Sequence, residues 1–244
     1  MSILPPEMIY KIASYIKSEK DIMVLAEVFP NLRFKFSSPR PVDYERYQTL
    51  KDKFIVEKII YKGYDMITFP NNLKFLQFYR YFNAPISLPL PEKLEYLCFG
   101  SGFNQPVDGL LPMKLKKLIF LGSFDKSVDK LPPNLQEINF SDKFNHPVNH
   151  LPKTLKILWL RESFRQSLDN LPDSIESLHL MCHYPQKITK LSANIKKFRT
   201  WTRFDRDYTG EREFDYLKEK YPELTIKYYF KRRFDVIEEN NVNL

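Results

Sequence analysis

The stretch FNQPVDGLLPMKLKKLIF, from Phe103 to Phe120, decides the fold because similar copies of it occur before and after it. Successive copies are marked by prolines 21, 21, 20, 20 and 20 residues apart, namely Pro70, Pro91, Pro112, Pro132, Pro152 and Pro172. A fixed period near 20 residues is typical of a chain that coils, in which each coil buries its apolar residues only by stacking on the next. The sequence therefore predicts a solenoid.

Each copy contains one short alternating segment. In Leu118-Ile119-Phe120 the period of two predicts a strand with two side chains pointing inward and one pointing outward. Stacked coils would align these strands in parallel, about 4.8 Å apart, in a sheet of roughly seven strands.

Two apolar columns are predicted on the return side of every coil, one aromatic and one aliphatic. Their members are Phe82, Phe103, Phe124, Phe144, Phe164 and Tyr184, then Ile86, Val107, Val128, Val148, Leu168 and Ile188. Because a column repeated within one chain follows a packing rule, we interpret both as structural.

Composition restricts the class of protein. The 244 residues are 43% hydrophobic and contain two cysteines, Cys98 and Cys182, at a spacing that suits neither a metal site nor a redox motif. No secretory segment or long apolar run occurs, so we expect a cytoplasmic chain with reduced thiols and no membrane partner. The net charge of +8 is scattered. Nucleic-acid binding by the aromatic-basic segment Lys227–Arg233 is therefore a minor alternative.

No pattern of catalytic residues is found. The sequence has no glycine-rich phosphate loop, nucleophile elbow or HExxH helix. His146 and His150 fall on variable positions of one coil, and His179, Cys182 and His183 are too few and too local for a convincing metal site. We therefore expect no enzyme activity, no cofactor and no bound metal.

The two ends of the repeat array differ from it and from each other. Leu4-Pro5-Pro6-Glu7 predicts the start of a helix, and Asp21 is expected to cap a second helix that Pro30 ends. Further on, a connecting helix is expected over 44–53 and a strand over 54–60. At the other end, a helix over 211–220 and a strand over 224–230 are expected to cap the last coil.

The repeat resembles a known family. Phe103-Asn104-Gln105-Pro106-Val107, followed by Leu111-Pro112, is similar to the FNIP repeat, a relative of leucine-rich repeats found in social amoebae and in giant viruses of amoebae. The resemblance covers residues 61–200. It implies an α+β repeat solenoid with a leucine-rich-repeat-like parallel sheet, a connector and N-terminal cap over 37–60, and a C-terminal helix-strand cap over 201–244.

The opening of the chain contains Leu4-Pro5-Pro6-Glu7, then Ile9, Ile12, Tyr15 and Ile16, then Asp21, Leu25, Ala26 and Val28. With these residues, 1–36 resembles a second family, the F-box. The F-box docks on the Skp adaptor of a cullin-based ubiquitin ligase, and a repeat domain behind it holds the substrate. The resemblance implies adaptor contacts through Leu4, Pro5, Ile9, Ile12, Ile16, Leu25 and Val28. The alternative is a helical hairpin that only caps the first coil.

Outward-facing positions of the predicted strands form ladders across the sheet. A structural ladder should be uniform, but these ladders vary and include side chains that dominate interface energetics. We predict a partner-binding face made by Ile119, Leu121, Trp159, Arg161, His179, Met181 and Trp201. The alternative is that the C-terminal cap folds over Met181 and Trp201 and hides them.

Together these patterns predict an interaction adaptor in the cytoplasm, or in the host cytoplasm if the chain is viral. Its helical end would bind a Skp-family adaptor and, through it, a cullin scaffold. Its solenoid would bind a protein substrate whose identity the sequence does not reveal. The alternative is a repeat scaffold with no role in ubiquitin ligation.

Overall fold

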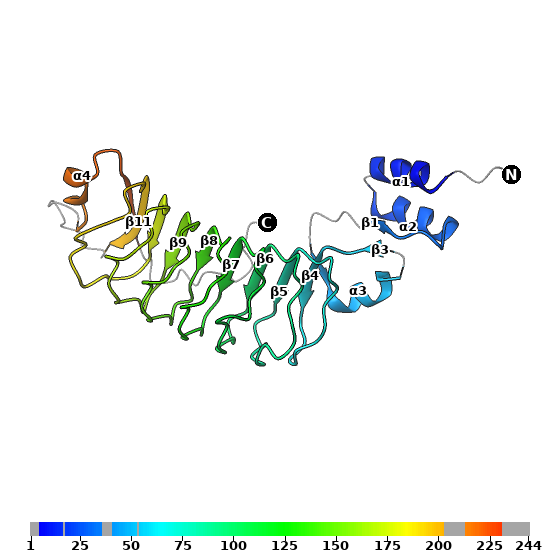
Figure 1. Cartoon of the computed structure of the whole chain (residues 1–244), viewed down its shortest axis with the longest axis horizontal. Coiled ribbons are helices and arrows are strands. Elements are labelled where there is room, and N and C mark those ends of the chain that lie inside the picture. Colours follow the sequence, from blue (N-terminus) through cyan, green and yellow to red (C-terminus); the bar gives the residue numbers. More distant parts are fainter. Residues whose placement is uncertain (1–4, 17, 36–40, 53, 203–212, 231–244) are drawn as a thin grey trace.

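A computed structural model describes residues 5–16, 18–35, 41–52, 54–202 and 213–230. Ten parallel strands form one sheet in the order β12-β11-β10-β9-β8-β7-β6-β5-β4-β2. Its strands are β2 (Val42–Asp43), β4 (Lys58–Tyr61), β5 (Phe75–Phe78), β6 (Tyr96–Phe99), β7 (Lys117–Phe120), β8 (Glu137–Asn139), β9 (Ile157–Leu160), β10 (Ser177–Leu180), β11 (Lys197–Thr202) and β12 (Thr225–Phe230). The predicted parallel solenoid is confirmed. Its strands line one long side, and its loops form the other (Figure 1).

The strand register follows the repeat period. Leu97 pairs with Leu118, which pairs in turn with Ile138, and all three are buried in the core. Side chains at the alternate positions, such as Ile119, point to the opposite side of the sheet, which we call the outer face.

The return-side columns are the main packing element of the core. Phe103, Phe124 and Phe144 are fully buried, and neighbouring rings of this column are stacked with centroids 6.2 Å apart. Each of these three rings also stacks on a phenylalanine ring from the strand side of its own coil, as Phe124 does on Phe120 at 3.7 Å. These offset aromatic stacks add to the burial of apolar area, so each coil depends on both of its neighbours.

A second ladder satisfies backbone amides on the return side. The side-chain oxygen of Asn83 accepts a hydrogen bond from the Asn104 N–H (2.8 Å), and that of Asn104 accepts one from the Asp125 N–H (2.9 Å). Asp125 and Asn145 continue the pattern onto Asn145 N–H (3.1 Å) and Arg165 N–H (2.9 Å). Loop amides that no β-ladder serves are thus paired with the preceding coil.

Three helices and a small sheet lie at the N-terminal end of the solenoid (Figure 1). They are α1 (Pro6–Tyr15), α2 (Glu19–Val28), the parallel pair β1 (Phe34–Lys35) and β3 (Phe54–Ile55), and α3 (Tyr44–Leu50). Three boundaries differ from prediction. The helix predicted over 44–53 ends at Leu50. Ser18, not Asp21, caps α2, because its side chain accepts the Asp21 N–H. The strand predicted over 54–60 is divided into β3 and β4, which belong to different sheets.

The C-terminal end is closed by β12 and by two tyrosine side chains. β12 pairs with β11 along its whole length, as predicted. The Tyr216 and Tyr221 hydroxyls accept hydrogen bonds from the Ile188 and Leu191 N–H groups, at 2.9 and 2.8 Å. The predicted helix is shorter than expected: α4 spans Leu217–Lys220, residues 213–216 form turns, and 211–212 lie outside the described residues. In the described part of the chain, no helix is both long and apolar enough to cross a bilayer.

Gly122 and Gly109 differ in how close the neighbouring coil lies, so replacing them tests the spacing between coils. Both have positive φ, 66° and 74°. A Cβ on Gly122 would lie 2.5 Å from the Ser101 carbonyl oxygen of the preceding coil, whereas a Cβ on Gly109 would meet nothing within 4 Å. We expect Gly109→Ala to lower the free energy of unfolding by about 1 kcal/mol, from backbone strain alone. Gly122→Ala should cost at least about 2 kcal/mol, because the clash is with backbone. Urea unfolding of both variants measures the difference, and equal losses would contradict close stacking at this turn.

Candidate functional site

The outer face carries a cluster of three side chains: Trp159 of β9, His179 of the adjacent β10, and Arg161, which directly follows β9. Parallel pairing of β9 with β10 places Trp159 directly beside His179. Their rings stack with centroids 3.4 Å apart and an interplanar angle of 19°. The Arg161 guanidinium lies over the Trp159 ring, 5.9 Å from its centroid. Register therefore assembles a cation–π and stacking cluster from residues two and twenty positions apart.

Arg161 is held in place by polar groups of the preceding coil. Its Nε donates to Asn139 Oδ1 (2.9 Å), and a terminal guanidinium nitrogen lies 3.8 Å from an Asp142 carboxylate oxygen. Burial lowers the pKa of Arg161, and Asp142 opposes that effect. The guanidinium thus has a fixed orientation at the edge of the sheet, which suits a recognition residue.

His179 is the buried member of this cluster, and its imidazole is neutral. Its Nε2 lies 3.0 Å from Ser177 Oγ, and its Nδ1 has no hydrogen-bond partner within the described ranges. Burial, followed by the charges of Arg199, Arg161 and Lys197, lowers the pKa of His179 to about 3. A neutral ring can stack on Trp159 without bringing another positive charge beside Arg161.

Two residues of the predicted partner-binding face are too buried to contact a partner. Ile119 and His179 are only 4% and 3% exposed, so they support the surface from below and offer a partner almost no contact area. The predicted residues that keep accessible area are Leu121, Trp159, Arg161, Met181 and Trp201. Met181 and Trp201 are half-buried.

Sequence reasoning missed the two residues that position Arg161. Asn139 occurs in the outward ladder, but nothing in its own coil marks it as an anchor for a side chain 22 residues later. Asp142 falls just after β8, outside the predicted strand pattern. The repeat period could have identified them. Asn139 and Asp142 lie one period of 20 residues before Trp159 and Glu162, which flank Arg161 in the sequence, so stacking brings them close to Arg161.

A second surface covers α1 and α2, where the predicted adaptor residues divide into two groups. Ile9 is 2% exposed and packs into the core, so it is not available to an adaptor. Ile12 and Val28 are exposed, Pro5 is exposed, and Ile16 and Leu25 are half-buried. Leu4 lies outside the described residues. The helical period alone does not distinguish the face that meets the solenoid from the face that meets solvent.

Sequence analysis did not assign three further apolar residues of this surface to the adaptor site. Tyr15 and Val24 are exposed, and so is Met8. The exposed apolar residues recur at helical spacing, as Met8, Ile12 and Tyr15 on α1 and as Val24 and Val28 on α2, so each helix has an exposed apolar stripe.

Among the described residues, the remaining titratable side chains form no assembled reaction centre. No group of three or more His, Cys, Asp or Glu residues able to hold a metal ion occurs in the described part of the chain. Burial raises the pKa values of Cys98 and Cys182 to about 12, so both thiols stay protonated at neutral pH. His146 and His150 lie on the return side beside Asp125 and Asp129 of the preceding coil.

The buried imidazole makes a testable contribution to stability. Because the pKa of His179 is about 3 in the folded chain, against about 6.5 when unfolded, its stabilisation is complete above pH 6.5 and is lost as pH falls toward 3. Between pH 6 and 5 we expect the free energy of unfolding to fall by about 1 kcal/mol more in the native chain than in His179→Gln. Urea unfolding at both pH values tests this prediction. An equal fall in the free energy of unfolding in the two chains would contradict it, because the folded chain would then hold His179 in its charged form.

Comparison with known proteins supports the repeat assignment. Residues 67–102 and 88–123 match the family model of the FNIP Repeat. No curated protein matches the chain. Among solved structures, the chain is similar to CroV588, described as a novel circular LRR protein, with 26% sequence identity and a TM-score of 0.49. The similarity covers 61% of this chain and 27% of that one, so the chain spans only about a quarter of its length. The FNIP resemblance predicted over residues 61–200 is thus matched by the family model within residues 67–123.

Proposed function

We propose that this chain is an interaction adaptor without chemistry of its own, in which α1 and α2 bind a Skp-family adaptor and the solenoid binds a protein substrate. One observation carries the proposal: the helical end keeps a set of large apolar side chains exposed although it has a core to bury them in. Ile9, Ile22 and Ala26 join the solenoid core, whereas Ile12, Val24 and Val28 stay outside it. A hairpin that served only as a cap would need the first set and would gain nothing from the second.

The substrate would bind on the outer face. Trp159 and Arg161 are the residue types most often found at the energetic centre of an interface, and Arg161 is already oriented by Asn139 and Asp142. Held there, a substrate would be kept at high effective concentration near a ubiquitin carrier brought by the cullin scaffold.

The adaptor proposal predicts loss of binding when the exposed helical residues become charged. We expect the double variant Ile12→Asp/Val28→Asp to weaken binding of a purified Skp-family adaptor to the full chain by at least about 100-fold in Kd, because two apolar anchors would be lost. Isothermal titration calorimetry measures the Kd. The matched control is Leu110→Asp/Met113→Asp on the solenoid. Ile12 and Leu110 are both 45% exposed, and Val28 and Met113 are both 63% exposed.

The outcomes separate the two functions considered. Binding by the native chain and the control, lost in the helix variant, supports the ligase-adaptor function. No binding by a folded native chain would overturn it and leave a repeat scaffold whose helices only cap the solenoid. Equal weakening in both variants would also contradict the proposal, because binding would then not depend on the helical surface.

A further inference from the structure

The C-terminal end of the outer face carries a group of positive charges. Parallel pairing of β9, β10, β11 and β12 aligns four side chains in one ladder: Trp159, His179, Arg199 and Lys227. Lys197 points to the same face, because it lies two residues before Arg199 on β11. We call Lys197, Arg199 and Lys227 the basic patch. It lies at the C-terminal end of the row of strands, at β11 and the adjacent β12 (Figure 1).

The basic patch has no acidic partner among the residues that the structure describes, although charges on other strands and strand starts are paired. Lys117 on β7 forms an ion pair with Glu137 on β8 at 3.1 Å. Lys196, one residue before β11, forms one with Glu176 at 2.9 Å. The same register thus pairs opposite charges elsewhere and leaves like charges together at the basic patch. A negatively charged partner molecule would complete the pairing there.

The positive potential of the patch extends over His179. After burial, the charges of Arg199, Arg161 and Lys197 are the next causes of the lowered pKa of His179. The imidazole is neutral, so it lies beside these cations without adding to their repulsion. A bound anion would relieve the repulsion that remains between them.

Aromatic side chains border the basic patch. Tyr229 pairs in register with Trp201, which lies two residues after Arg199 on β11. Tyr229 is exposed and Trp201 is half-buried. Tyrosine and tryptophan beside an arginine are the composition typical of the centre of a protein interface. A partner should therefore bring apolar side chains together with its negative charges.

The spacing of these side chains matches that of an extended peptide. Lys197, Arg199 and Trp201 follow one another at steps of two residues on β11, about 6.6 Å each. An extended peptide that lies along β11 presents its own alternate side chains at the same interval. Acidic side chains at positions i and i+2 would meet Lys197 and Arg199, and an apolar side chain at i+4 would meet Trp201.

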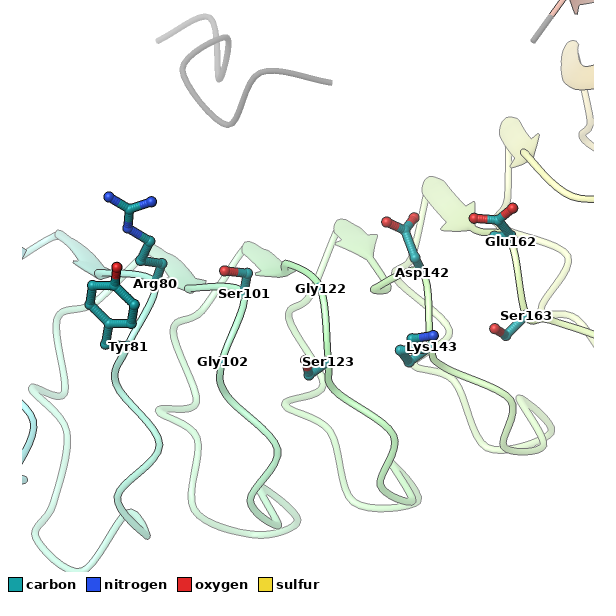
Figure 2. A pocket seen from close by; sticks show the side chains of 10 residues that line it. All are labelled: Arg80, Tyr81, Ser101, Gly102, Gly122, Ser123, Asp142, Lys143, Glu162 and Ser163. Carbon is teal, nitrogen blue, oxygen red and sulfur yellow. The ribbon is translucent and has the colours of Figure 1, made fainter. Parts of the chain in front are cut away.

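The positive charge does not continue along the sheet. From His179 toward β7, the ladder runs through Trp159, Asn139 and Ile119, which are uncharged. A shallow groove of about 580 Å³ follows the ends of β5 to β9, but its lining has charges of both signs. Figure 2 shows Arg80 at one end of this groove and the carboxylates of Asp142 and Glu162 on successive coils at the other. A short acidic segment therefore fits the outer face better than a long nucleic-acid strand, which needs a continuous row of cations.

We propose that the basic patch binds an acidic segment of the substrate protein, with two carboxylates two residues apart at Lys197 and Arg199. Lys227 pairs with the second carboxylate from the adjacent strand. An apolar side chain two residues further along the segment contacts Trp201 and Tyr229. This inference rests on the proposed function, because it names the chemistry of the substrate that binds on the outer face.

Peptide binding to the full chain tests the inference. The probe is a dye-labelled peptide with the sequence SESESFS in one-letter code, and the reference is SQSQSFS, in which glutamine replaces both glutamates. Fluorescence anisotropy measures both Kd values. We expect the Kd of the glutamate peptide to be lower by at least about ten-fold, because only this peptide supplies carboxylates to the patch.

A charge reversal with a matched control locates the binding site. Lys197→Glu/Lys227→Glu should abolish the preference for the glutamate peptide. Lys114→Glu/Lys153→Glu makes the same change in net charge at turns away from the outer face and should keep the preference. All four lysines are exposed. Lys197→Arg/Lys227→Arg retains the charges and should also keep the preference, so that a loss caused by the glutamates reflects charge and not misfolding.

Three results would overturn the inference. The first is an equal Kd for the two peptides, and the second is equal weakening by the patch and control reversals. The third is tighter binding of a single-stranded oligothymidylate that is lost in Lys197→Glu/Lys227→Glu, because the partner would then be nucleic acid. Calorimetry with the Skp-family adaptor distinguishes this failure from that of the proposed function. Adaptor binding without a peptide preference contradicts the acidic substrate alone, and a peptide preference without adaptor binding contradicts the ligase-adaptor function alone.

Discussion

The interaction on which the rest of the structure depends is the stacking of one coil on the next. No coil has an apolar surface that it can bury by itself: Phe124, for example, has its own strand residue Phe120 on one side and Phe103 and Phe144 from the adjacent coils on two others. The Asn83–Asn104–Asp125–Asn145 ladder applies the same rule to polar groups, since each side chain serves the amide of the following coil. Stability is therefore a property of neighbouring pairs of coils.

Stacking also determines where chemistry can be presented. Once the register is set by the core, every equivalent position of the repeat falls on a straight ladder, whether or not the core uses it. Repeat positions whose side chains do not pack in the core are free to vary. Side chains at such positions on neighbouring coils can then form one cluster. Trp159, His179 and Arg161 meet in this way on the outer face, and Arg80 and Glu162 mark the two ends of one groove. Both surfaces are by-products of one packing rule.

The two ends of the solenoid cover the apolar side of the terminal coil in different ways. The last coil is closed by β12 and by two tyrosine hydroxyls, of Tyr216 and Tyr221. These hydroxyls accept hydrogen bonds from the backbone N–H groups of Ile188 and Leu191. The first coil is closed by helices that contribute Ile9, Ile22 and Ala26 to the core and still carry large apolar side chains outside it. The second solution leaves large apolar side chains exposed on α1 and α2, and this supports the functional proposal.

The sequence by itself determined the repeat, the inward columns, the parallel strands and the strand over 224–230, because these depend on periodicity that is visible in one dimension. It also indicated the two N-terminal helices through their proline start and apolar spacing. It did not determine that Ile9 faces the core while Ile12 faces solvent, that Ile119 is buried on the outer face, or that Asn139 and Asp142 hold Arg161. Tertiary structure decided these points, because burial and side-chain contact depend on which coils and helices lie next to one another in space.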